Sequence, residues 1–222
     1  MKRFLLFALL LLLILTLTAG TAAGQFPYTD AQMLASLESD SLLAPDTLVA
    51  RIDGELALIR AHTPEMSAIH ASCVSPLPGF VTVLMTPEAM GEYLAGRHAE
   101  MNQLDAQFGM SLYVGGGQFG FVTLTSALPY KPERLAEAYL TVTGVTDAFP
   151  EVCGGDPPDQ IAILAPGVYR FRHGWGDCPC GCPWENVFVF RIEDGVVTLV
   201  AMSTTDVTVP RMTWGKLKGL YR

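Results

Sequence analysis

The stretch FVTVLMTPEA, residues 80–89, decides the fold of the middle of this 222-residue chain. Its first six residues form a compact apolar run, which predicts a buried strand. Thr86 is expected to cap a helix, and Pro87 takes the first helical position, where its missing N–H costs no hydrogen bond. The stretch therefore predicts a strand that passes directly into a helix.

Further apolar runs continue this pattern toward the C-terminus. We expect the helix to break at Gly96 and to end at Gly109, and the glycines 115–117 to form a hairpin turn. The later elements are strands over 110–114 and 119–125, a helix from Lys131 that Gly144 closes, and a strand over 145–152. This β-α-β-β-α-β order predicts a ferredoxin-like antiparallel sheet with two helices on one face.

The flanking segments have different patterns. A short helix is expected over 30–43, and a stronger one begins at an Asp46-Thr47 cap and ends near His62, before Pro64. After the ferredoxin-like unit, short strands are predicted over 160–164, 168–173, 184–192 and 196–203, with turns at Pro166-Gly167 and Asp194-Gly195. They form an antiparallel β-meander, packed on or appended to the first unit.

The predicted fold class is thus α+β. Its parts are a signal peptide (1–24), an N-terminal helical segment (25–72), the ferredoxin-like unit (73–153), the β-meander (154–209) and a C-terminal helix or tail (210–222).

The N-terminus has the layout of a cleavable signal peptide. Lys2 and Arg3 precede an apolar run from Phe4 to Leu17, and small residues follow up to Gly24. An uncleaved anchor is the alternative, but it usually needs about 20 consecutive apolar residues. We therefore expect cleavage after Ala23 or Gly24, a secreted or periplasmic protein, and no stable membrane span.

The charge balance disfavours nucleic acid as a partner. The full chain has a net charge of −8, from 14 Lys and Arg against 22 Asp and Glu. Without Lys2 and Arg3 the basic count falls to 12 and the net charge to −10. A phosphate backbone would repel this balance, so the expected partner is a protein or a small ligand.

Five cysteines in an exported chain indicate disulfides and one thiol left over. In the predicted topology the first strand lies antiparallel to the fourth, so Cys73 before the one and Cys153 after the other become neighbours. We therefore expect a Cys73–Cys153 bond.

The loop GDCPCGC, residues 176–182, holds the other three cysteines. Cys178 can bridge to Cys182 across the tight bend, which leaves Cys180 unpaired. A zinc or copper site, with His173 or Asp177 as a further ligand, and a redox dithiol are the alternatives. The disulfide interpretation is preferred because exported thiols tend to oxidise.

Two resemblances accompany these motifs. The Gly176-Asp-Cys-Pro-x-Gly-Cys182 hairpin and the Thr213–Arg222 ending are similar to those of uncharacterised secreted bacterial proteins, although Cys180 departs from that pattern. The resemblance implies no known activity. Residues 79–150 resemble the propeptide domains of subtilisin-type proteases, which implies an inhibitor or folding-chaperone module.

Other motifs offer little chemistry. His62, Met66 and His70 have the spacing of a helical copper site, but Pro64 interrupts the helix. No Gly-x-Ser-x-Gly elbow, HExxH helix or EF-hand loop is present. The sequence therefore predicts a non-catalytic binding or structural module without a cofactor. A propeptide-like inhibitor is the alternative, and a metal-binding protein based on the cysteine loop is the third hypothesis.

Overall fold

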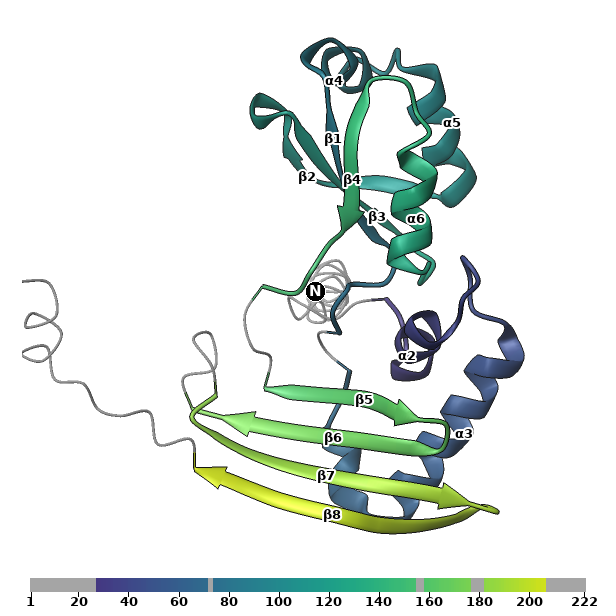
Figure 1. The fold of residues 1–222 in the computed structure, drawn as a ribbon, viewed down its shortest axis with the longest axis vertical. Coiled ribbons are helices and arrows are strands. Elements are labelled where there is room, and N and C mark those ends of the chain that lie inside the picture. Colours follow the sequence, from purple (N-terminus) through teal and green to yellow (C-terminus); the bar gives the residue numbers. More distant parts are fainter. Residues whose placement is uncertain (1–26, 72–73, 155–157, 177–181, 207–222) are drawn as a thin grey trace, which may run out of the picture.

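The computed structural model describes residues 27–71, 74–154, 158–176 and 182–206 (Figure 1). Within them the fold is α+β, with two antiparallel four-stranded sheets and five α-helices. The predicted signal peptide (1–24) and C-terminal helix (210–222) lie outside the described residues.

The helices are α2 (Asp30–Glu38), α3 (Asp46–His62), α4 (Pro87–Leu94), α5 (Ala99–Phe108) and α6 (Pro132–Tyr139), with 3₁₀ turns η1 (Pro64–Ala68) and η2 (Gly117–Phe119). The strands are β1 (Phe80–Met85), β2 (Met110–Gly116), β3 (Phe121–Ser126), β4 (Val145–Pro150), β5 (Asp159–Ala165), β6 (Val168–Trp175), β7 (Trp184–Glu193) and β8 (Val196–Asp206).

The first sheet has the strand order β2-β3-β1-β4, with every neighbouring pair antiparallel. The expected pairing of the first strand with the last is confirmed, since Val83 of β1 lies opposite Ala148 of β4. Thr86 caps α4 as expected, because its side chain accepts a hydrogen bond from the backbone N–H of Ala89. The expected break at Gly96 separates α4 from α5, where this glycine has φ +70°.

The alternation along β1 decides which face of this sheet is covered. Val81 and Val83 are fully buried in a core with side chains of α4, α5 and α6, among them Met90, Met101 and Leu135. Figure 1 shows the helices beside β1 and β4. The alternate side chains of β1 point to the opposite face, which we call the open face.

Several expected boundaries are wrong; for example, the fourth strand ends at Pro150 rather than at residue 152. The turn after β2 is η2 and not the glycines 115–117, because β2 extends to Gly116 and β3 begins at Phe121 rather than at residue 119. Pro45, and not Asp46-Thr47, is the N-cap of α3, and it makes no side-chain capping bond. Helix α2 ends at Glu38 instead of residue 43, since the Ser39 hydroxyl bonds to the N–H of Ser41 and competes with helical bonding.

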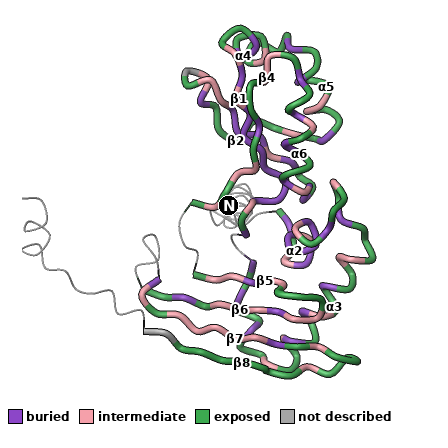
Figure 2. Tube along the Cα trace, in the orientation of Figure 1, coloured by how far each residue is buried: buried purple, intermediate pink, exposed green. Residues whose placement is uncertain are grey.

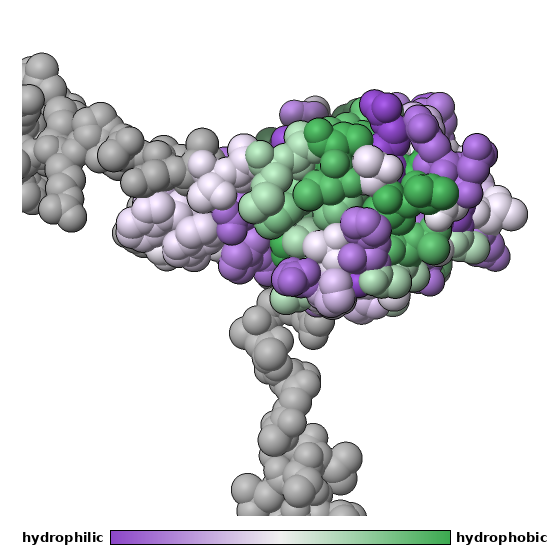
Figure 3. Space-filling view, turned by 90° about the horizontal axis from the view of Figure 1, so that it is seen from below, coloured by the Kyte–Doolittle hydropathy of each residue, from purple (hydrophilic) through white to green (hydrophobic). Residues whose placement is uncertain are grey.

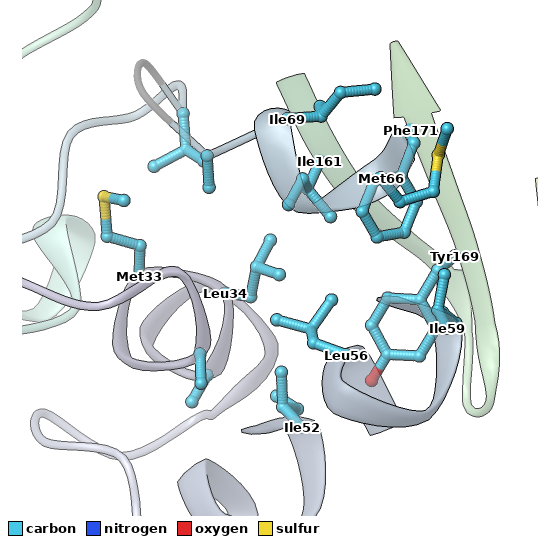
Figure 4. Packing of buried hydrophobic residues seen from close by; sticks show 14 of the residues in the cluster. Met33, Leu34, Ile52, Leu56, Ile59, Met66, Ile69, Ile161, Tyr169 and Phe171 are labelled. Carbon is cyan, nitrogen blue, oxygen red and sulfur yellow. The ribbon is translucent and has the colours of Figure 1, made fainter. Parts of the chain in front are cut away.

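The second sheet, ordered β5-β6-β7-β8, packs on the N-terminal helices rather than on the first unit. In Figure 4, Leu34 of α2 and Leu56 of α3 converge on Ile161 of β5 and Tyr169 of β6. This core combines residues within 28–71 and Val74 with residues of the strands β5 to β8. The first sheet and its helices are therefore inserted within a discontinuous second unit, whereas the expectation was a meander packed on, or appended to, the ferredoxin-like unit.

Hydrogen bonds join the two units near the end of α2. The Lys131 ammonium, at the start of α6, donates to the carbonyl oxygens of Ser39 at 2.6 Å and Leu37 at 3.3 Å. The hydroxyl of Tyr28 donates to the carbonyl oxygen of Ser126 at the end of β3. Burial raises the pKa of Tyr28 from its ordinary value of 10 to about 12. The joint thus combines a buried phenol with a cation at a helix C-terminus.

Candidate functional site: a cleft on the open face of the first sheet

The open face of the first sheet carries a cleft of about 650 Å³. β1 contributes Phe80, Thr82 and Leu84, the alternate residues to the buried Val81 and Val83. The period of two that places valines in the core necessarily presents these three side chains on the other side. The remaining lining residues, from β2, η2, β3, β4 and the segments that flank the sheet, are Leu77, Tyr113, Val114, Phe119, Phe121, Thr123, Phe149, Glu151, Val152, Cys153 and Gly154.

Five of the lining residues are aromatic. Phe80 and Tyr113 make an edge-to-face pair with ring centroids 5.2 Å apart, and Phe119 and Phe121 are stacked at 6.4 Å. Phe119 is 73% exposed and Tyr113 is 63% exposed. Large apolar side chains with this exposure, gathered around one hollow, are typical of a binding surface rather than of scattered surface residues.

A polar pair forms the floor. The Oγ1 atoms of Thr82 and Thr123 lie 2.8 Å apart across β1 and β3, and both residues are buried, at 5% and 6% exposure. Thr82 also donates its hydroxyl proton to Oε2 of Glu151, at the end of β4. The threonine pair thereby fixes the position of one carboxylate at the edge of an apolar cleft.

A missing side chain gives the cleft its shape. A Cβ atom built on Gly116 would lie 2.4 Å from the ring of Phe121, closer than any real contact. The absence of a side chain at this position leaves space for the Phe121 ring beside Gly116. The neighbouring Gly120 adopts φ +76°, a left-handed conformation that favours glycine, and so allows the turn from η2 into β3.

Of the four cysteines predicted to form disulfides, only Cys153 and Cys182 are among the described residues. Cys153 lines the cleft, and both Cys153 and Cys182 are disulfide-bonded. Cys73, Cys178 and Cys180 lie outside the described residues, as does Asp177. The pairings Cys73–Cys153 and Cys178–Cys182, and the free thiol at Cys180, therefore stay predictions.

His173, the other suggested metal ligand, is engaged elsewhere. Its Nδ1 lies 2.6 Å from Oδ1 of Asp159 on the neighbouring strand β5, and its ring stacks on Trp175 at 5.8 Å. Within the part of the chain that the structure describes, no three His, Cys, Asp or Glu side chains are grouped as metal ligands.

The helical copper-site alignment is not formed. His62 ends α3, and Met66 lies in the 3₁₀ turn η1, where it is buried in the core of the second unit. His70 follows that turn and contacts Oδ2 of Asp30 through Nδ1 at 3.0 Å. Pro64 starts η1, so the i, i+4, i+8 spacing never falls on one helix.

Sequence reasoning did not find the cleft, although it recognised the strands that build it. The sequence shows the strand β1, whose side chains alternate between two faces. A cleft forms only because the face opposite the helices stays uncovered. The signal that could have pointed to it is the aromatic content of residues 113–121 and 149 beside a glycine-rich turn.

Comparisons with protein-family models, with curated proteins and with solved structures gave no match. Among the helices in the described ranges, none is both long and apolar enough to cross a membrane.

Proposed function

We propose that this protein is a non-catalytic binding module of the secreted or periplasmic space and that it binds an apolar ligand in the cleft on the open face of the first sheet. The observation that carries the proposal is the aromatic wall around Phe119 and Tyr113, exposed to solvent beside a buried polar floor. A cleft of about 650 Å³ falls within the range of small-molecule sites, roughly 300–1,000 Å³. The signal-like N-terminus supports the location.

The inserted unit is proposed to be ferredoxin-like. Its support is the strand order β2-β3-β1-β4, with α4 and α5 between β1 and β2 and α6 between β3 and β4. This arrangement leaves one sheet face free of its own helices, which suits a binding role.

A fluorescent apolar probe tests the function. N-phenyl-1-naphthylamine, which is uncharged at pH 7, should bind saturably with enhanced fluorescence. Phe119→Ala should weaken this binding about 3- to 10-fold, since one aromatic wall is lost. Leu164→Ala is the matched control, because Leu164 is also an exposed large side chain but lies on β5 of the other unit. Absent saturation, or equal affinities for the wild type and the Phe119→Ala variant, would contradict the proposal.

A propeptide-like protease inhibitor is the second candidate. The exposed apolar side chains of the open face favour it, because a surface of this kind also suits a protein partner. Inhibition of a subtilisin-type protease that weakens with Phe119→Ala would support this candidate. No inhibition at high micromolar concentration would remove it.

We propose two disulfides, Cys73–Cys153 and Cys178–Cys182, with Cys180 as a free thiol. The bonded state of Cys153 and Cys182 supports this pattern. Thiol titration of the denatured, unreduced protein should give one free thiol, and peptide mapping should recover both pairs. Three free thiols together with bound zinc or copper would instead support the metal-binding alternative.

A further inference from the structure

The cleft has an uneven distribution of charge. Of the described residues that line it, Glu151 is the one acidic side chain, and none is Lys, Arg or His. None of the ion pairs found in the described part of the chain includes Glu151. The cleft thus presents a carboxylate without a counter-ion from its own walls.

The position of this carboxylate is fixed rather than free. Thr82 donates to its Oε2, and Thr82 is itself held by Thr123 at 2.8 Å. The backbone carbonyl of Glu151 accepts from the N–H of Leu77 at 2.8 Å, so the main chain is also anchored. A partly buried carboxylate with one hydrogen bond and apolar neighbours is stabilised by an opposite charge in the same site.

The aromatic walls favour the same kind of ligand group. The faces of Phe and Tyr rings attract cations through their quadrupoles, and the attraction is stronger where water is displaced. Phe80, Tyr113 and Phe149 line the cleft together with Glu151. Rings and carboxylate therefore both favour an ammonium-type group, whereas an anionic ligand would be repelled by Glu151 and by the net charge of −8.

We infer that the ligand of this cleft is a small apolar molecule that carries a cationic amine, with the amine beside Glu151 and the apolar body between the aromatic walls. This inference rests on the proposed binding function and names its ligand class. The cleft volume of about 650 Å³ argues for a small molecule, because it matches a drug-sized ligand and needs no extended protein surface.

Three probes that share a phenylalkyl group and differ in their terminal group test the inference: 4-phenylbutylamine, 4-phenylbutanol and 4-phenylbutyrate. Each probe competes with N-phenyl-1-naphthylamine at low ionic strength. The amine should bind about 5- to 10-fold more tightly than the alcohol, and the carboxylate should bind most weakly. Glu151→Gln keeps an acceptor for Thr82 and should reduce the preference for the amine to within about twofold of the alcohol. Glu65→Gln, an exposed acid on η1, is the control and should leave all three affinities unchanged.

The outcomes separate the two proposals. If the amine and alcohol bind equally well, or if Glu151→Gln keeps the preference for the amine, the cationic ligand class is overturned while apolar binding stands. If none of the probes and no naphthylamine binds, the binding function itself fails. Binding of a Phe-Leu-Lys-Leu-Phe peptide without binding of the free amine would assign the cleft to a protein partner and overturn the small-ligand inference.

Discussion

At the scale of single residues, glycine and threonine position groups that line the cleft. Gly116 leaves the space that the Phe121 ring fills, and the Thr82–Thr123 pair holds the carboxylate of Glu151. The glycine acts because it has no side chain, and the threonines act through hydrogen bonds of their hydroxyl groups. Substitutions at these positions should therefore change binding by moving Phe121 or Glu151.

Gly116→Ala is expected to displace the Phe121 ring. The added Cβ would lie 2.4 Å from that ring, so the free energy of unfolding should fall by about 1–3 kcal/mol, as for overpacked cores. Gly115→Ala is the matched control, since its Cβ would meet Leu112 at an ordinary 3.6 Å. Urea unfolding and naphthylamine titration of both variants provide the measurement. Equal effects of the two substitutions would show that Phe121 does not depend on Gly116 for space.

At the scale of elements, Asp30 connects α2 to α3 and to the segment after η1. Its carboxylate accepts hydrogen bonds from Arg60 Nη2 at 2.6 Å and from the backbone N–H of Ala71 at 2.8 Å, and it contacts His70. Burial alone would raise the pKa of Asp30, but the bonds from Arg60, Ala71 and His70 outweigh it and hold the pKa below its ordinary value of 3.8. The helices of the second unit are thus joined by an ionised group.

Asp30→Asn should lower the free energy of unfolding at pH 7 by about 2 kcal/mol, because hydrogen bonds to a charged group are lost. Since the pKa is lowered in the folded state, the contribution of the carboxylate is complete above the ordinary pKa of 3.8 and is lost as the pH falls through the folded pKa. The difference between the wild type and the variant should therefore shrink at pH 2.5. Asp53→Asn, exposed on α3, should change little at either pH. A difference that stays constant with pH would contradict the ionised role of Asp30.

The edge strand β8 is apolar and exposed along most of its length. Figure 2 shows this exposure, and Figure 3, which views the molecule from the β8 side, shows hydrophobic surface there. Leu199, Val200 and Met202 are all exposed, and Met202 reaches 60%. Natural edge strands usually carry charges that prevent pairing with other chains, but no charged residue occurs between Val196 and Thr205.

Val200→Lys is therefore expected to reduce concentration-dependent aggregation, because a lysine on the edge disfavours strand pairing. Static light scattering over a concentration series measures this effect. Leu58→Lys, at an exposed position of α3, adds the same charge away from the edge and is the control. A similar reduction by both variants would attribute the effect to net charge instead of to the edge.

At the scale of the whole molecule, one unit is inserted into the other. The chain builds α2 and α3, leaves to form the first sheet and its helices, and returns to build the second sheet over the same helices. Lys131 and Tyr28 bond across the joint. Because the two cores share no residues, the joint decides whether the units unfold together.

Lys131→Met should weaken the joint by about 1–2 kcal/mol, because the ammonium no longer bonds to the carbonyls at the end of α2. The expected result is a broadened or two-step thermal transition, measured by calorimetry together with near-ultraviolet circular dichroism. Arg97→Met removes an exposed cation of the inserted unit and should keep the wild-type transition. A single sharp transition in the Lys131 variant would mean that the cores are coupled by other contacts.

The sequence by itself determined the local elements. The apolar run 80–85, the Thr86-Pro87 start and the glycines 96, 144 and 167 act through nearest neighbours, so their strands, caps and turns follow from local sterics and hydrogen bonding. The antiparallel pairing of β1 with β4 followed as well, since short right-handed connections leave few arrangements.

Tertiary structure alone decided which apolar faces are covered. Burial depends on residues far apart in the chain, so no local pattern shows that residues within 28–71 and Val74 cover the second sheet while the first sheet keeps an open face. The candidate site lies on the sheet face that the helices leave uncovered. Phe80 and Thr82 belong to the same strand as the buried Val81 and Val83, and they line a cleft because the helices pack on the other side.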